Sequence, residues 1–293
     1  MSAQKASDML VQMIEQDERY RVLRQIPRPH TDMPSGGSPP PGRCIAIVDV
    51  ECTGLDVEND HLIELAIMLV FVDDDGVVAG HIGPVSWLED PGVAIDPRIT
   101  LLTCLAAEHV AGKSINDPMA ASLLDRADII VAHNARFDAA WLEKRYPALA
   151  GKAWACSCTE IDWQLLCYEG RSQQHLLAQH GWFTNAHRAA EDVWSLFHLL
   201  QQEQTGPGEH RPQTHLQRLL EASSQITEQV QACRAPYSAK DRLKARGYRW
   251  DAVRKVWWKE MGRSDLAAER SWYRENGLPE FFTKPITAFE RHR

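Results

Sequence analysis

The chain has 293 residues, 44% of them hydrophobic and 25% charged, which is enough for one or two domains with a large buried core. With 17 glycines and 16 prolines, this composition excludes a collagen-like, low-complexity or wholly disordered chain. The net charge of −8, taken as an average, argues against a nucleic-acid partner.

Hydropathy and cysteine content predict where the protein resides. No apolar run approaches the ~18 residues that a membrane-spanning helix needs. The N-terminal residues lack the basic and then apolar segments of a signal peptide. The seven cysteines, an odd number spread from Cys44 to Cys233, do not indicate a disulfide framework. We therefore expect a cytoplasmic protein that contacts no membrane.

The average charge hides a difference between the two ends of the chain. Residues 233–293 hold 15 Lys and Arg and 8 Asp and Glu, a net charge of +7, whereas residues 1–232 carry −15. A basic C-terminal module could contact phosphates, and an acidic body could hold cations. Two domains with different surfaces would give the same split.

Residues 1–26 are predicted to form an amphipathic N-terminal helix, because apolar residues recur there at spacings of three and four. We expect this helix to dock on a protein partner. Residues 27–42 contain six prolines and three glycines and predict an extended linker.

Runs of Ile, Val and Leu, followed by helical periodicity, organise residues 43–201. The predicted elements in chain order are strands at Cys44–Val50, Leu62–Val72 and Val77–Ile82, a helix after Asp117, a strand at Asp128–Ala132, a helix at Ala135–Arg145, a strand near Trp154, and helices at Thr159–Leu166 and Ala189–Gln201. Strands followed by strand-helix alternation predict an α/β fold with a mixed sheet and helices on its faces. Residues 202–232 are predicted to be a linker and a helix.

Residues 233–293 are predicted to form a small basic, Trp-rich α+β domain. Basic and aromatic residues alternate there: Lys240, Arg242, Lys244, Arg246, Arg249, Arg254 and Lys255 among Tyr248, Trp250, Trp257 and Trp258. Basic side chains could follow phosphates while rings stack on unpaired bases, each stack contributing ~1 to 3 kcal/mol. The tryptophans could equally form the core of a domain this small.

Acidic residues stand at the ends of the predicted strands and at helix starts. Asp49 and Glu51 are two apart at the end of an apolar strand, so they share one face. Two carboxylates brought together are costly unless a cation neutralises them, although solvated surface acids would explain the pair if it stood alone. Asp138 follows in the first turn of a helix that Asn134 is placed to cap. Asp192 lies on the apolar face of another helix and is drawn inward.

The order Asp-x-Glu, then HNxxFD, then His-x-x-x-x-Asp resembles that of the DEDDh 3′-to-5′ exonucleases, a family that includes the proofreading subunit of bacterial DNA polymerase III, ribonuclease T and oligoribonuclease. The resemblance covers residues 43–200 and includes IELA at 63–66 and VAGKSI at 110–115. It implies a ribonuclease-H-like mixed five-stranded sheet with flanking helices, and an exonuclease domain over residues 43–201. Glu64, within IELA, is expected to have a structural hydrogen-bonding role.

The resemblance also implies a two-metal site with a histidine base. Four acids would bind two divalent ions, Mg²⁺ or Mn²⁺: Asp49, Glu51, Asp138 and Asp192. Oxygen ligands suit these ions, and a pair of them ~3.5 to 4 Å apart serves phosphodiester hydrolysis. His187, which precedes the helix of Asp192, is expected to take the proton of the attacking water.

Substrate contacts follow from the same resemblance. Thr53, Gly54 and Leu55 are expected to lie against the terminal nucleotide. Further candidates are Leu105, Asn134 and Phe137, although capping explains Asn134 and core packing explains Phe137 almost as well. The family commonly has His-Gly-Ile-Thr or Thr-Gly-Leu-Thr where this chain has TCLA at 103–106, which leaves the substrate preference open.

The sequence as a whole predicts a metal-dependent 3′-to-5′ exonuclease. It would act on 3′ ends of single-stranded nucleic acid, with DNA favoured over RNA. The alternatives are an exoribonuclease of the same family and a catalytically idle scaffold that binds nucleic acid.

Overall fold

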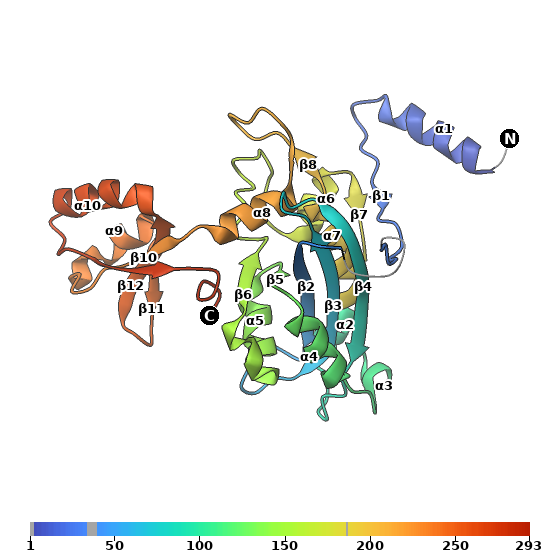
Figure 1. Cartoon of the computed structure of the whole chain (residues 1–293), viewed down its shortest axis with the longest axis horizontal. Helices are drawn as coiled ribbons and strands as arrows, with labels where there is room; N and C mark the ends of the chain where they lie inside the picture. The colour runs from blue at the N-terminus through green and yellow to red at the C-terminus, as the bar shows by residue number, and fades with distance from the viewer. Residues whose placement is uncertain (1–2, 34–39, 186) are drawn as a thin grey trace. The chain divides into compact units, whose positions relative to one another are not determined.

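The computed structural model describes residues 3–33, 40–185 and 187–293 (Figure 1). The chain divides into two compact units. The large unit comprises residues 1–222 together with His292 and Arg293, and the small unit comprises Ser223–Arg291. The small unit therefore begins at Ser223, earlier than the predicted start at Cys233, because the strand that precedes Cys233 belongs to its sheet.

A five-stranded sheet forms the centre of the large unit. Its strands are β2 (Arg43–Cys52), β3 (Leu62–Val72), β4 (Val78–Leu88), β5 (Ile129–Ala132) and β6 (Ala153–Cys156), in the spatial order β4-β3-β2-β5-β6. The pairs β2–β3 and β3–β4 are antiparallel, whereas β2–β5 and β5–β6 are parallel. The mixed five-stranded sheet is thereby confirmed. All eleven residues of β3 are buried, as expected for a continuous apolar run covered on both faces.

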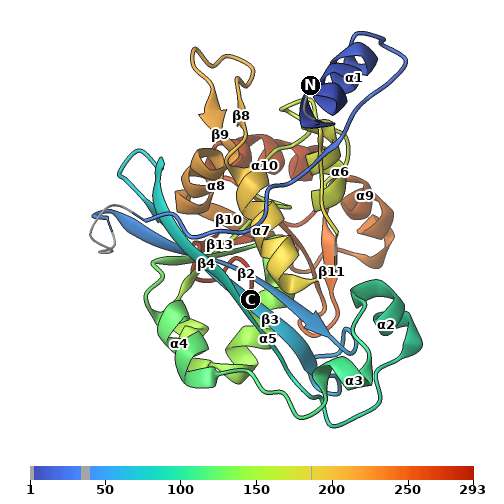
Figure 2. The ribbon, with the colours of Figure 1, turned by 90° about the vertical axis from the view of Figure 1, so that its right-hand side faces the viewer.

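Helices cover both faces of this sheet. The helices of the large unit are α1 (Ala3–Glu15), α2 (Pro97–Thr103), α3 (Ala107–Val110), α4 (Asp117–Asp125), α5 (Ala135–Arg145), α6 (Gln173–Gln179), α7 (Ala189–Leu200) and α8 (His215–Ser224). Helices α4 and α5 pack in one core with Ala46 and Val48 of β2. Side chains alternate along a strand, so Ile45 and Ile47 face the other way, where α7 lies across β2 and β3 (Figure 2). Every helix in the described ranges is too short or too polar to cross a membrane.

The N-terminal segment differs from its prediction. Helix α1 ends at Glu15, and the chain then turns and forms β1 (Arg24–Gln25), which pairs in parallel with β7 (Trp182–Phe183). Residues 20–26 are thus not helical, and Arg24 and Ile26 donate backbone hydrogen bonds to Gly181 and Phe183, a distant contact that helical periodicity does not reveal. The apolar side chains of Met9 and Met13 are exposed, and the docking of α1 on a partner stays a prediction.

Part of the predicted linker is docked on the large unit. The carbonyl of Pro27 accepts a hydrogen bond from the Trp194 indole at 2.6 Å. The backbone of Asp32 forms an antiparallel β-bridge with the backbone of His81 in β4. Residues 34–39 of this linker lie outside the described residues.

The helix predicted at Thr159–Leu166 is wrong. These residues form turns, in which the Asp162 carboxylate accepts the N–H of Leu165 and the Trp163 indole donates to the Ser157 carbonyl. Side-chain hydrogen bonds of this local kind compete with helix formation. Just before α8, strand β8 (Glu203–Gln204) pairs in antiparallel fashion with β9 (Gln213–Thr214).

The small unit is an α+β fold, as predicted. Its elements are β10 (Thr227–Gln231), α9 (Lys240–Ala245), β11 (Arg249–Asp251), β12 (Val256–Gly262), α10 (Leu266–Glu275) and β13 (Phe282–Ile286). The strands form an antiparallel sheet in the order β11-β12-β10-β13. Its core includes Tyr248, Tyr273 and Phe281, with Trp257 and Trp272 packed against it. Trp250 is half exposed, so the tryptophans serve the core only in part.

Candidate active site

The first two acids lie at the end of the central strand β2. Val48 and Val50 face the core formed with α4 and α5, so Asp49 and Glu51 point to the opposite side, where α7 lies. The pairing of β2 with β3 is irregular between Glu51 and Cys52, which ends the regular ladder directly after the two acids.

Three carboxylates converge at this point. Oxygen atoms of Asp49, Glu51 and Asp192 lie within 4.8 Å of one another, close enough to share a metal ion. Asp192 comes from the first turn of α7, and its side chain is buried. The chain thus brings acids separated by about 140 residues to one place, as their order in the sequence predicted.

Backbone groups hold the Asp192 carboxylate in position. Its Oδ2 accepts hydrogen bonds from the N–H of His187 at 2.7 Å and the N–H of Arg188 at 3.2 Å. Gln174 of α6 approaches Oδ1 at 3.5 Å. The loop before α7 therefore fixes the carboxylate that reaches toward β2.

Asp138 lies beside the three acids but is not part of their group. It stands in the first turn of α5 and is 3% exposed. Burial raises the pKa of Asp138 well above its ordinary value. The hydrogen bond that the backbone N–H of Val50 donates to its carboxylate lowers the pKa and offsets only part of this rise. Its charge contributes to the raised pKa of Asp49.

The electrostatics of these acids fit a bound cation. Burial raises the pKa of Asp49 well above its ordinary value, and the charges of Asp138 and Asp192 raise it further. Burial, and next the charge of Asp192, raise the pKa of Glu51 to about 8. Burial raises the pKa of Asp192 to about 6, against the hydrogen bond from His187. The charges of Arg188 near Glu51 and of His187 near Asp192 offset only part of this effect. A divalent ion with oxygen ligands would supply the remaining neutralising charge.

Binding of Mn²⁺ should therefore become weaker as the pH falls. Glu51 has a raised pKa of about 8, so below that pH an ion must displace a proton from it. We expect the affinity to drop by about tenfold for each pH unit between pH 8 and 6, with proton release on binding. Calorimetric titrations in buffers of different ionisation enthalpy measure both quantities. An affinity that does not change over this range would contradict the assigned ligands.

A fifth acid at this end of the sheet has its own partner. Glu64 of β3 stands opposite Glu51 and is 1% exposed. Its carboxylate accepts hydrogen bonds from Nε of Arg188 at 3.0 Å and from the backbone N–H of Ala189, the first residue of α7, at 3.2 Å. The predicted structural role of Glu64 is confirmed. Sequence reasoning missed Arg188, although its position next to His187 could have indicated it.

His187 lies on the loop that supports Asp192. It is exposed, and its backbone adopts a left-handed conformation with φ of +64°. The charge of its ring contributes to lowering the pKa of Asp192, which places the ring within electrostatic reach of that carboxylate. A non-glycine residue held in this conformation is uncommon and often marks a functional position.

The turn after β2 presents an apolar side chain to solvent. Thr53 donates to Asp60 at 3.2 Å and accepts the N–H of His61 at 3.0 Å. A Cβ on Gly54 would lie 2.3 Å from Oδ2 of Asp60, so only glycine fits while Asp60 closes the turn. Leu55 at the tip is 84% exposed and available to a ligand.

The other three substrate candidates are less accessible or differ from expectation. Leu105 is 2% exposed, so its side chain offers no surface to a base, whereas Leu101 on the preceding helix α2 is 84% exposed. Asn134 stands at the start of α5, but its side chain makes no capping hydrogen bond because its backbone is left-handed, with φ of +88°. Phe137 is half-buried and packs against Trp141, with ring centroids 6.1 Å apart.

The strand order β4-β3-β2-β5-β6, with half-buried carboxylates at the end of the central strand, is that of a ribonuclease-H-like fold. The model of the exonuclease family RNase_T matches residues 46–199, which are more than half of the chain. The chain belongs to this exonuclease family.

Individual relatives are more distant. A ribonuclease T from Shewanella denitrificans is 33% identical over 112 residues, covering 33% of this chain and 49% of the relative. The chain thus spans about half the length of this curated relative. Among solved structures, Exonuclease X in complex with 5′ overhanging duplex DNA is 22% identical, with coverage of 61% and 86% and a TM-score of 0.36. E. coli Exonuclease I with a 5cy-dT13 oligonucleotide is 17% identical, with coverage of 53% and 39% and a TM-score of 0.43. At such TM-scores neither structure bears on the function.

Proposed function

We propose that the chain is a 3′-to-5′ exonuclease that uses divalent metal ions to hydrolyse phosphodiester bonds at 3′ ends of single-stranded nucleic acid, with DNA as its substrate. The observation that carries the proposal is the convergence of Asp49, Glu51 and Asp192 within 4.8 Å, on elements far apart in the sequence. Membership of the exonuclease family supports the same chemistry.

The residues of the site have distinct roles in this proposal. Four acids hold the ions: Asp49, Glu51, Asp138 and Asp192. Two divalent ions, when bound, activate water and neutralise charge on the leaving oxygen. His187 takes a proton from the attacking water as general base. The turn of Thr53 and Gly54 lets the exposed Leu55 lie against the terminal nucleotide.

RNA is the second candidate substrate. The 33% identity to a ribonuclease T favours an RNA substrate, because the name of that relative describes an enzyme that degrades RNA. The departure at residues 103–106 and the burial of Leu105 alter the surface that would meet the terminal base. DNA and RNA of the same sequence therefore distinguish the two candidates.

Matched oligonucleotides test the proposed function. DNA and RNA of one sequence, labelled at the 5′ end and either free or blocked at the 3′ end, are incubated with and without Mn²⁺. We expect stepwise shortening of the free DNA only with Mn²⁺. Cleavage of 3′-blocked strands at internal positions would reject exonuclease action, and preferential shortening of RNA would move the substrate to the second candidate.

Replacing His187 with Asn should separate catalysis from ion binding. Asn tolerates the left-handed backbone at this position, so the loop is preserved. Loss of a general base typically slows turnover by about 10² to 10⁴-fold. We expect that loss in the rate constant, with Mn²⁺ affinity unchanged. A His187→Asn variant with full activity would remove this residue from the mechanism.

A further inference from the structure

The small unit leaves one face of its sheet without a helix. Its elements follow the order β-α-β-β-α-β, in which both helices pack on the same side of a four-stranded antiparallel sheet. The core on that side joins Leu243 of α9 and Tyr273 of α10 to Val230 and Met261 of the sheet. Residues at alternate positions of the strands point to the opposite face, the uncovered face, on which no described helix packs. Only its edge is covered, where Ile286 is buried and Arg291 contacts Glu260 and Thr227.

The uncovered face carries a row of aromatic and basic residues. The register places Arg249 of β11 beside Trp258 of β12, Trp258 beside Gln231 of β10, and Gln231 beside Phe282 of β13. Phe282 is 64% exposed. Lys284 follows two residues later on the same face and is also exposed. Two rings and two cations from β11, β12 and β13 thus lie on this face, with Gln231 of β10 between the two rings.

The charge of this face is positive. In the part of the chain that the structure describes, Arg249 and Lys284 form no ion pair. The two acids on the same face both have partners: Glu260 is paired with Arg291 at 2.8 Å, and Asp251 with Arg254 at 3.8 Å. Residues 223–291 as a whole hold 14 Lys and Arg against 9 Asp and Glu. A negatively charged ligand is therefore complementary to the face.

We propose that this uncovered face, centred on Trp258 and Phe282, binds single-stranded nucleic acid. Unpaired bases stack on the two rings, and Arg249 and Lys284 contact the flanking phosphates. Four-stranded sheets with exposed aromatic residues are a known platform for single strands, because every base offers a flat face to a ring. A base-paired duplex cannot present its bases in this way, so the face should discriminate against it. The binding does not depend on the carboxylate site.

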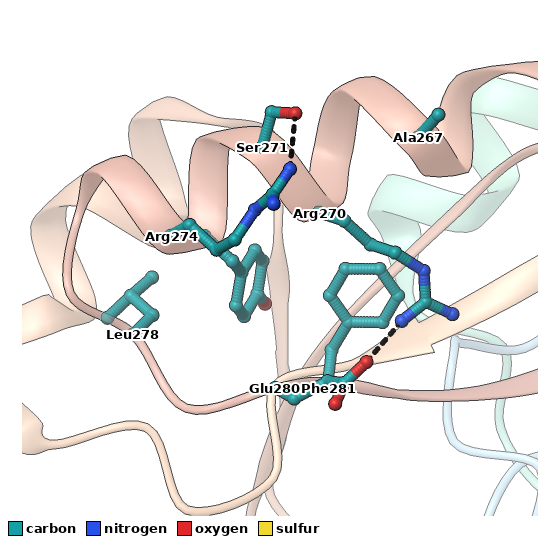
Figure 3. A pocket seen from close by; sticks show the side chains of 8 residues that line it. Ala267, Arg270, Ser271, Arg274, Leu278, Glu280 and Phe281 are labelled. Atoms are coloured by element: carbon teal, nitrogen blue, oxygen red, sulfur yellow. Dashed lines mark hydrogen bonds and ion pairs between the residues drawn. The ribbon is translucent and has the colours of Figure 1, made fainter.

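The opposite side of the small unit provides a control surface. A cavity of about 480 Å³ lies there between α10 and the segment before β13 (Figure 3). Its cations have partners within the unit: Arg270 pairs with Glu280, and Arg274 donates to Ser271 at 3.1 Å. Tyr237 lies in the turn that leads directly into α9, one of the two helices on the covered side. It is 81% exposed and has Lys240 over its ring.

Fluorescence polarisation with the full chain in EDTA tests the proposal, because without divalent ions the strand is not degraded. The probes are labelled oligothymidylate of about 20 nucleotides and a blunt duplex of the same length. We expect Phe282→Ala and Trp258→Ala each to weaken single-strand binding by about tenfold. Arg249→Ala and Lys284→Ala should reduce its salt dependence. The controls Tyr237→Ala and Arg274→Ala should leave affinity within about twofold.

Several results would overturn the proposal. Wild-type affinity in Phe282→Ala and Lys284→Ala, both changes of exposed side chains that leave the core intact, would show that this face is not the site. Equal affinity for the duplex would indicate general charge attraction rather than stacking. A failure of nuclease activity in the oligonucleotide assay leaves this binding measurement valid, so the two proposals are tested separately.

Discussion

Replacing Asp49 with Asn is expected to abolish metal-stimulated degradation and, at the same time, to stabilise the ion-free protein. The loss of a carboxylate that binds the ions should reduce turnover by at least about 1,000-fold. Burial and neighbouring acids raise the pKa of Asp49, so its ionised form opposes folding at pH 8. The neutral amide removes that cost. Degradation of labelled DNA and thermal unfolding in EDTA measure the two effects.

The stability effect has a definite dependence on pH. The folded pKa of Asp49 is raised above its ordinary value of 3.8, so the folded protein binds the proton more tightly than the unfolded chain. The advantage of Asn should thus be largest at pH 8 and vanish as the pH falls toward 4. Glu58→Gln, a change of an exposed acid on the neighbouring turn, is the matched control. It should leave degradation unchanged and alter stability by less than about 1 kcal/mol, because its ion pair with Lys144 is exposed. An Asp49→Asn variant that retains activity would refute the site.

Replacing Arg188 with Met should give the largest loss of stability. Glu64 is 1% exposed, and the change would leave its carboxylate buried without its ionic partner. Breaking a buried pair in this way costs about 3 to 5 kcal/mol, but Arg188 is 41% exposed and water can approach, so we expect about 2 to 3 kcal/mol. Denaturant unfolding in EDTA measures the free energy.

A second change tests the physical reason. Glu64→Gln keeps an oxygen for the N–H of Ala189 but removes the charge. The double variant Arg188→Met/Glu64→Gln should thus recover most of the lost stability. Lys144→Met, at an exposed ion pair with Glu58, should cost less than about 1 kcal/mol. If the double variant is no more stable than Arg188→Met alone, the loss of stability does not come from the unpaired, buried charge of Glu64.

The central elements of the large unit could be predicted from local sequence. Leu62–Val72 and Ala135–Arg145 begin and end as predicted, because a continuous apolar run and a helix stopped before Pro147 are strong local signals. The positions of the acids could be predicted from their order and spacing, since Asp49 and Glu51 lie near the end of a strand and Asp138 and Asp192 lie in the first turns of helices. The convergence of Asp49, Glu51 and Asp192 follows from that placement.

Features that depend on distant contacts could not be predicted. Residues 20–26 have helical periodicity, but Arg24 and Gln25 pair with β7, more than 150 residues away, and such pairing overrides local preference. The Arg188–Glu64 pair joins two ordinary residues separated by 124 positions. The residues that share the uncovered face of the small unit could be identified only from the register of four strands, which the sequence pattern of β12 alone does not reveal.

Anomalous diffraction at the manganese edge from crystals grown with Mn²⁺ tests the central claim most directly. The account predicts two peaks among the carboxylates of Asp49, Glu51, Asp138 and Asp192, at coordination distances of about 2.1 to 2.3 Å. A well-ordered structure with these carboxylates in place and no manganese among them would contradict it.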